Sequence, residues 1–104
     1  MYEKQAADCL AALGNVTRLR LYRLLVRTGS AGLNVGEQQE RLGVPASTLA
    51  HHLTSLVRAG LVEQERRGRE IVSRADYAAM DGLVEFLTAE CCSGVAPAEK
   101  IDAA

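Results

Sequence analysis

Apolar side chains recur along this chain at spacings of three and four residues, the period of amphipathic helices. Two of the predicted helices meet across a tight turn that contains glycine, which is the helix-turn-helix layout. The predicted fold is therefore mainly α with a β-hairpin wing, a winged helix-turn-helix in the order helix, helix, helix, helix, strand, strand, helix. The helices are expected at 3–13, 16–28, 35–42, 46–59 and 76 to about 90, and the strands at 61–66 and 70–74, joined by Arg67-Gly68-Arg69.

Length and composition indicate one small domain. The 104 residues include one Phe, three Tyr and no Trp. A chain this short buries only about two-thirds of its unfolded surface, so a partner subunit would stabilise it by burying more. We expect one domain over 1–92 and a flexible tail over 93–104. There is no signal-peptide pattern and no apolar run near the roughly 20 residues of a membrane span. The odd number of cysteines then favours reduced thiols in the cytoplasm.

Charge is distributed unevenly although the net charge is only −1. Residues 18–74 carry ten Arg and five Glu, whereas the flanking segments carry two Lys and eight acidic residues. Arginine offers paired donors to phosphate oxygens. We therefore expect nucleic acid to bind the middle of the chain, the alternative being a solvated surface of mixed charge.

The predicted helix at 46–59 has an apolar face and a polar face that carries hydroxyls, an imidazole and an arginine but no acid. Short polar side chains near the start of the second helix of a helix-turn-helix can reach base edges in the major groove. Neighbouring His51 and His52 point about 100° apart on a helix, so they are not expected to chelate one ion. The expected DNA contacts are Ser47, Thr48, His51 and Arg58 on the helix and Arg66, Arg67 and Arg69 on the wing.

Adjacent thiols at Cys91 and Cys92 follow the last predicted helix, and Cys9 lies near the other end of the chain. Thiolates select soft, thiophilic ions. Adjacent cysteines are badly placed to bond to each other, because a disulfide requires a particular Cα separation and dihedral angle. The pair is therefore a candidate receptor for one ion that both sulfurs share.

Three segments resemble the ArsR/SmtB family of winged-helix repressors in their order and spacing: Leu13–Leu21, Val44–Leu53 and Leu56–Val62. The resemblance covers about residues 5–92. It implies a homodimeric repressor that releases operator DNA on binding an inducer, with the first and last helices at the dimer interface. The apolar residues of those helices that would meet the partner are Leu10, Leu13, Met80, Leu83, Val84 and Leu87.

Two familiar metal sites of that family are missing here. Many arsenic-sensing members carry Cys-Val-Cys at the start of the third helix, where this chain has Leu33-Asn34-Val35-Gly36-Glu37. Zinc-sensing members use Asp and His on the last helix, and residues 76–92 contain no His. Cys91-Cys92 is similar instead to an arsenic-responsive subgroup whose last helix ends in a cysteine pair. The resemblance implies trivalent arsenic (arsenite or methylarsenite) or antimonite as inducer, and no organic cofactor.

The role of Cys9 stays open: it is a third ligand, from the same or the partner chain, or a small buried hydrophobe. If only the pair binds, a monomethylated arsenical suits it better than arsenite. The rival function is a thiol redox or persulfide sensor of the same fold, but a helix C-terminus and Glu90 disfavour the thiolate that an oxidant requires. A thiol enzyme is not expected, because both histidines lie on the recognition helix. A dimerisation module that does not bind DNA is a further alternative.

Overall fold

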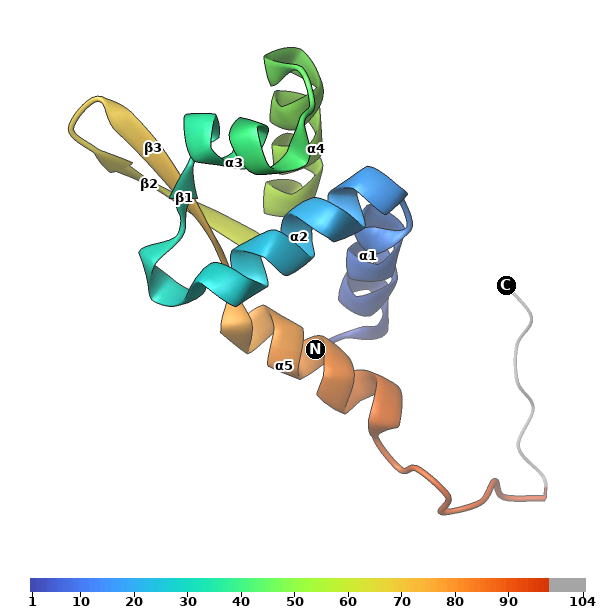
Figure 1. The fold of residues 1–104 in the computed structure, drawn as a ribbon. Helices are drawn as coiled ribbons and strands as arrows, with labels where there is room; N and C mark the ends of the chain where they lie inside the picture. Colours follow the sequence, from blue (N-terminus) through green and yellow to red (C-terminus); the bar gives the residue numbers. More distant parts are fainter. Residues whose placement is uncertain (98–104) are drawn as a thin grey trace.

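The helices and strands of residues 1–97, the part of the chain that the computed structural model describes, follow the predicted order with one strand added (Figure 1). This confirms the winged helix-turn-helix. The boundary at residue 92 stays a prediction: residues 93–97 are exposed and outside any helix or strand, and 98–104 lie outside the described residues. The elements are α1 (Glu3–Leu13), α2 (Val16–Thr28), the 3-10 turn η1 (Gly29–Ala31), β1 (Leu33–Asn34), α3 (Val35–Leu42), α4 (Ala46–Arg58), β2 (Val62–Arg67), β3 (Glu70–Ala75) and α5 (Tyr77–Thr88).

The sheet has three antiparallel strands in the order β1-β3-β2, so the predicted hairpin carries a third strand on its β3 edge. Leu33 pairs with Ser73 and Asn34 with Val72. The two residues of β1 are too few to display a strand period, because they become a strand only by pairing with β3. The hairpin strands run one residue further than predicted, to Arg67 and Ala75 respectively.

Polar side chains fix the starts of three helices by accepting backbone N–H bonds that the first turn leaves unpaired. Asn15 accepts from the amide of Arg18 at the start of α2, and Asp76 accepts from Ala79 at the start of α5. At the start of α3, Asn34 accepts from the amide of Glu37, and Glu37 accepts from the amide of Asn34 in return. This reciprocal pair orients the first helix of the helix-turn-helix.

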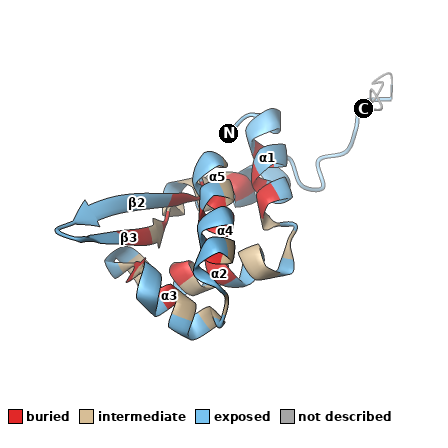
Figure 2. Ribbon diagram, turned by 90° about the horizontal axis from the view of Figure 1, so that it is seen from above, coloured by how far each residue is buried: buried red, intermediate tan, exposed pale blue. Residues whose placement is uncertain are grey.

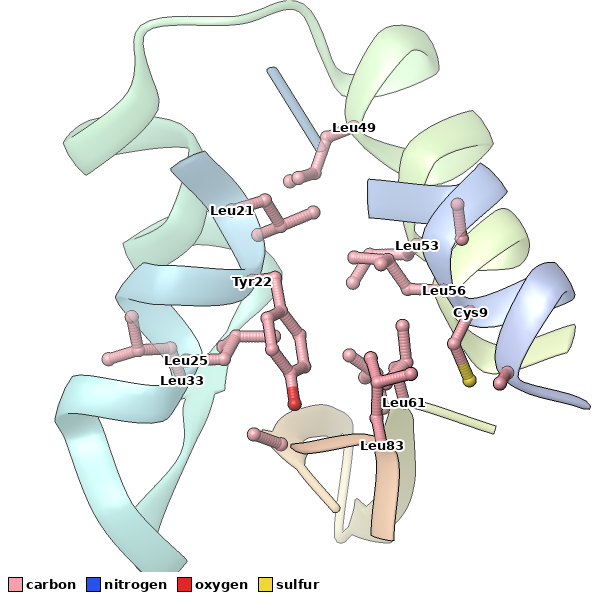
Figure 3. Close-up of a cluster of buried hydrophobic side chains, with 14 residues drawn as sticks. Cys9, Leu21, Tyr22, Leu25, Leu33, Leu49, Leu53, Leu56, Leu61 and Leu83 are labelled. Carbon is pink, nitrogen blue, oxygen red and sulfur yellow. The ribbon is translucent and has the colours of Figure 1, made fainter. Parts of the chain in front are cut away.

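Leucine side chains from α2 and α4 meet at the centre of the domain and are joined by smaller residues of α1 (Figure 3). Leu21 and Leu25 come from α2, and Leu49, Leu53 and Leu56 come from α4. Burying one such side chain stabilises the fold by about 1.5–3 kcal/mol. The core therefore holds α4 by one face only. In the β2–β3 hairpin, β2 is exposed after Val62, whereas β3 is exposed at Glu70 and Ile71 and buried or half-buried from Val72 onward (Figure 2).

The last helix ends at Thr88, two residues before the predicted end. Ala89 leaves the helical conformation with a ψ of 136°, and Glu90 and Cys92 both have positive φ. The predicted end of this helix was wrong because the spacing of apolar residues does not indicate where the backbone leaves the helical conformation. Cys91 and Cys92 therefore lie in a turn beyond the helix.

Candidate DNA interface and thiol pair

The recognition helix α4 presents the face that the sequence predicts. Glycine at position 43 adopts a left-handed conformation that ends α3, and α4 begins after Pro45. Ser47 and His51 are exposed and Thr48 is half-buried, on the side of α4 opposite its buried leucines. The first turn of α4 therefore offers hydroxyl and imidazole groups to a ligand, with no acidic side chain in that turn to repel phosphate.

Two further hydroxyls of α4 are already used inside the helix. Thr54 donates to the carbonyl of Ala50 at 2.9 Å, and Ser55 donates to the carbonyl of His51 at 3.3 Å. Such bonds to the preceding turn compete with an external acceptor. The first turn of α4 is thus better suited to base contact than its middle.

His52 belongs to the scaffold and not to the exposed face. Its side chain is 8% exposed, and its Nδ1 lies 3.5 Å from Nη1 of Arg18. Arg18 in turn donates from Nε to the carbonyl of Ala12 at 2.7 Å, so the pair ties α4 to the end of α1. Burial, followed by the charges of Arg18 and His51, lowers the pKa of His52 from its ordinary 6.5. A helical wheel sets His52 at the border of the two faces and cannot detect this burial.

The three predicted wing contacts differ in their surroundings. Arg66, Arg67 and Arg69 are all exposed at the hairpin. Nε of Arg67 lies 3.4 Å from Oε1 of Glu65, whereas Arg66 and Arg69 form no salt bridge with any residue of 1–97. Arg66 and Arg69 are therefore the wing cations that are available for phosphate.

Arg74, which sequence reasoning did not single out, neutralises the acids of the wing. It forms salt bridges with Glu65 and, at 3.0 Å, with Glu63, and it donates to the carbonyl of Ser30 at 3.2 Å. Hydrogen bonds from Arg74 and then Arg67 lower the pKa of Glu65. The cross-strand pairing of Glu63 with Arg74 in the β2–β3 register is the signal that could have identified this role.

The thiols of Cys91 and Cys92 are exposed, and their sulfurs lie 3.0 Å apart. The turn is held by a bond from the amide of Cys91 to the carbonyl of Thr88 and by two bonds from Ser93 to the carbonyl of Glu90. The hydrogen bond with Cys92, followed by desolvation, raises the pKa of Cys91. Two thiols at this separation can share one soft ion, because a bond from the ion to sulfur replaces the bond from sulfur to its proton.

Cys9 lies apart from the pair, inside the core (Figure 3). Its side chain is 1% exposed and its thiol donates to the carbonyl of Ala59 at 3.4 Å. Burial and then the charge of Asp8 raise the pKa of Cys9. Within residues 1–97, no three His, Cys, Asp or Glu side chains converge where they could hold a metal ion. The structure therefore does not bring Cys9 to the pair within one chain.

The apolar residues predicted for the dimer interface divide into two groups. Val84 and Leu87 on α5 are 56% and 57% exposed, and Leu10 on α1 is exposed as well. Leu13 and Met80 are half-buried against the core, and Leu83 is buried in it. Leu83 thus packs inside its own chain, and α5 turns an apolar surface outward beside it. None of the helices that the structure describes is long and apolar enough to cross a membrane.

Residues 13–65 match the family described as helix-turn-helix domain. An uncharacterized HTH-type transcriptional regulator of Methanocaldococcus jannaschii is 39% identical over 67 residues, which cover 64% of this chain and 72% of the relative. An ArsR-like transcriptional regulator from Rhodococcus sp. RHA1 has the same fold, with a TM-score of 0.71 and 31% identity, covering 81% of this chain and 76% of that structure. This chain is a transcriptional regulator of the ArsR family.

A further structural neighbour of this ArsR-family regulator is described as a homodimeric winged helix-turn-helix DNA-binding domain, Mb0332 of Mycobacterium bovis, a possible ArsR-family transcriptional regulator. Its TM-score is 0.66 at 30% identity, and the match covers 84% of this chain and 81% of that one. These relatives are regulators and not enzymes, which confirms the expectation that the chain is not an enzyme. The family also agrees with the resemblance found in the sequence.

Proposed function

We propose that this ArsR-family regulator is a homodimeric repressor that releases operator DNA when trivalent arsenic, or antimonite, binds Cys91 and Cys92. The observation that carries the proposal is the thiol pair itself: two exposed sulfurs 3.0 Å apart, in a turn at the end of the helix that exposes the apolar residues Val84 and Leu87. An ion bound to both sulfurs would reshape that turn. The change would reach the dimer interface through α5.

The DNA-binding part of the proposal rests on α4 and the wing. Ser47, Thr48 and His51 on the first turns of α4 would meet base edges in the major groove. The exposed Arg66 and Arg69 on the wing would meet the phosphates beside them, and Arg58 would bind the backbone near the end of α4. Two copies of α4 in a dimer would enter successive major grooves, about 34 Å apart.

The homodimer is supported by the outward apolar surface of α5. Val84 and Leu87 are each more than half exposed in a single chain. The α5 helix of a second subunit, together with Leu10 of its α1, could cover them. The Mycobacterium bovis neighbour is described as homodimeric. A dimer is also what a helix-turn-helix protein needs to read two half-sites.

The choice of ion follows from the number of thiols at the site. A structural zinc site takes four ligands, and residues 1–97 offer only two thiols at this turn. Two thiolates match a monomethylated arsenical, which has two open positions, and Cys9 is buried too deeply in its own chain to complete a triad without rearrangement. Methylarsenite is therefore the preferred inducer, ahead of arsenite.

The raised pKa of Cys91 supports ion capture over redox sensing. In oxidation, a thiolate that is already formed attacks the oxidant as a nucleophile, whereas a soft ion displaces the proton as its bond to sulfur forms. Redox sensing would require a lowered pKa, from a nearby cation or a helix N-terminus. The turn that follows α5 provides neither among the described residues.

The test is a titration of the protein–operator complex with methylarsenite, arsenite, antimonite and zinc, followed by fluorescence anisotropy. We expect methylarsenite to weaken DNA binding between severalfold and about a hundredfold, the usual range of allosteric coupling. The double variant Cys91→Ser, Cys92→Ser should bind DNA normally and should no longer release it when methylarsenite is added. The control variant is Cys9→Ser, which removes one buried thiol.

Two results would contradict the proposal. Arsenical release that persists in the double serine variant would locate the site elsewhere. Release by mild oxidant, with a new sulfur–sulfur bond in the mass spectrum and no arsenic adduct, would establish the redox sensor instead. Mass spectrometry after each treatment separates these outcomes.

A further inference from the structure

Four arginines line one groove between α2 and α3. Arg20, Arg23 and Arg27 lie along α2 at intervals of three and four residues, and Arg41 joins them from the last turn of α3. The groove encloses about 280 Å³ and is completed by the apolar side chains of two leucines. Because the fourth arginine comes from a second helix, the cluster is more than the polar stripe of one amphipathic helix.

No carboxylate within residues 1–97 forms a salt bridge with this cluster. All four arginines are exposed, and the salt bridges formed within residues 1–97 involve Lys4, Arg67 and Arg74 but none of the four. Like charges gathered in one groove repel each other and destabilise the folded chain unless an anion lies among them. The guanidinium fork fits phosphate oxygens with two parallel hydrogen bonds, which makes a phosphate-rich ligand the natural occupant.

The position of the groove identifies the source of the phosphate. In a helix-turn-helix protein the second helix lies in the major groove and the first helix crosses the DNA backbone. Here α3 is that first helix, and Arg41 lies two residues before the turn at Gly43 that leads into α4. Figure 1 shows α2 beside α3, so the arginines of α2 extend the surface that begins at Arg41.

We propose that this arginine groove binds the phosphate backbone of DNA that flanks the base pairs read by α4. The inference rests on the proposed DNA-binding function and adds a second phosphate surface to the wing. It makes the operator footprint longer than the contacts of α4 and the wing require. The arginines of α2 and α3 would then act together with Arg58 of α4 and the arginines of the hairpin.

The experiment measures the salt dependence of DNA binding by the full chain. The slope of log K against log salt concentration falls in magnitude by about 0.9 for each phosphate contact that is lost. We expect the quadruple variant Arg20→Gln, Arg23→Gln, Arg27→Gln, Arg41→Gln to lose two or more units of slope per protomer on a duplex with extended flanks. On a duplex trimmed to the α4 half-sites, the loss should be smaller.

Matched single variants separate a local contact from a general charge effect. Arg23→Gln and Lys4→Gln each remove one exposed positive charge, but Lys4 lies on α1 and pairs with Asp8 at 3.2 Å. We expect only Arg23→Gln to lower the slope. Circular dichroism and urea unfolding establish that the variants fold, which is expected because the four side chains are exposed.

Three results would overturn the inference in distinguishable ways. Wild-type protein that binds no duplex DNA would overturn the proposed function together with the groove. Wild-type binding with an unchanged slope in the quadruple variant would overturn the groove alone and leave its arginines to a different anionic partner. An equal loss of slope on trimmed and extended duplexes, or an equal loss in Lys4→Gln, would overturn the assignment to flanking backbone.

Discussion

Replacing Gly32 with alanine should destabilise this domain more than the same replacement at Gly29, although the two glycines have nearly the same backbone conformation. Gly29 has φ 69° and ψ −157°, and Gly32 has φ 65° and ψ −168°. Residues other than glycine rarely adopt this backbone conformation, and holding one there costs about 1–3 kcal/mol of stability. Both substitutions therefore share the same conformational penalty.

The surroundings of the two glycines differ. A Cβ at Gly29 would meet nothing within 4 Å, whereas a Cβ at Gly32 would lie 2.5 Å from the carbonyl oxygen of Ser73 and 2.8 Å from Cγ1 of Val72. Ser73 and Val72 are the β3 residues that pair with β1, so backbone must move to relieve the contact. Overpacking of this kind costs about 1–3 kcal/mol, which gives about 2–6 kcal/mol in total for Gly32→Ala.

Urea unfolding followed by circular dichroism measures both costs. We expect Gly29→Ala to lower the unfolding free energy by about 1–3 kcal/mol and Gly32→Ala to lower it by about 1–3 kcal/mol more. Equal losses in the two variants would refute the claim that close packing of η1 on β3 requires glycine. If Gly32→Ala were as stable as the wild type, the argument from backbone conformation would be refuted as well.

Three other substitutions test the scaffold of the site. Burial lowers the pKa of His52, so the folded state binds fewer protons than the unfolded state at acidic pH. The contribution of His52 to the unfolding free energy should therefore be unchanged above the unfolded pKa of about 6.5. As pH falls below that value, the wild type should become less stable. Urea unfolding between pH 5 and 8 should show this loss in the wild type and in the exposed control His51→Gln, and not in His52→Gln. Asn34→Ala removes the cap of α3 and should lower stability by about 0.5–2 kcal/mol, read as a fall in melting temperature. Leu56→Ala, at a fully buried position, should cost about 2–5 kcal/mol in chemical unfolding, whereas the more exposed Val57→Ala should cost clearly less.

The helices of this fold are predictable because each one is organised by its own sequence. Leu49, Leu53 and Leu56 fall on one face of α4 at spacings of four and three, and that face alone decides which side chains remain outside. The polar residues that the wheel sets opposite them are all exposed or half-buried, whereas His52, at the border of the two faces, is buried. The resemblance in the same segments then leads to the family that the comparisons support.

What the sequence could not provide depends on contacts between distant segments. The short strand β1 exists only through its pairing with β3, and the environment of His52 includes Arg18 of another helix, whose Nη1 lies 3.5 Å from its Nδ1. The salt bridges of Arg74 need the hairpin register, and the arginine groove needs α3 beside α2. The turn after Thr88 depends on positive φ angles that no spacing rule signals.

The position of the thiol pair limits how an inducer could act on DNA. Cys91 and Cys92 are exposed beyond the end of α5, and α5 packs chiefly against α1 while Tyr77 at its start donates to the carbonyl of Val26 in α2. The helix α1 is joined to the end of α4 by the bond from Cys9 to Ala59. A change at the pair can reach α4 of the same chain through the packing of α5 on α1 and through the core that Leu83 shares with α4. The exposed apolar residues Val84 and Leu87 lie in the last turns of α5, directly before the turn that carries the pair. We therefore expect the proposed release of DNA to come chiefly from a changed arrangement of the two subunits in the dimer.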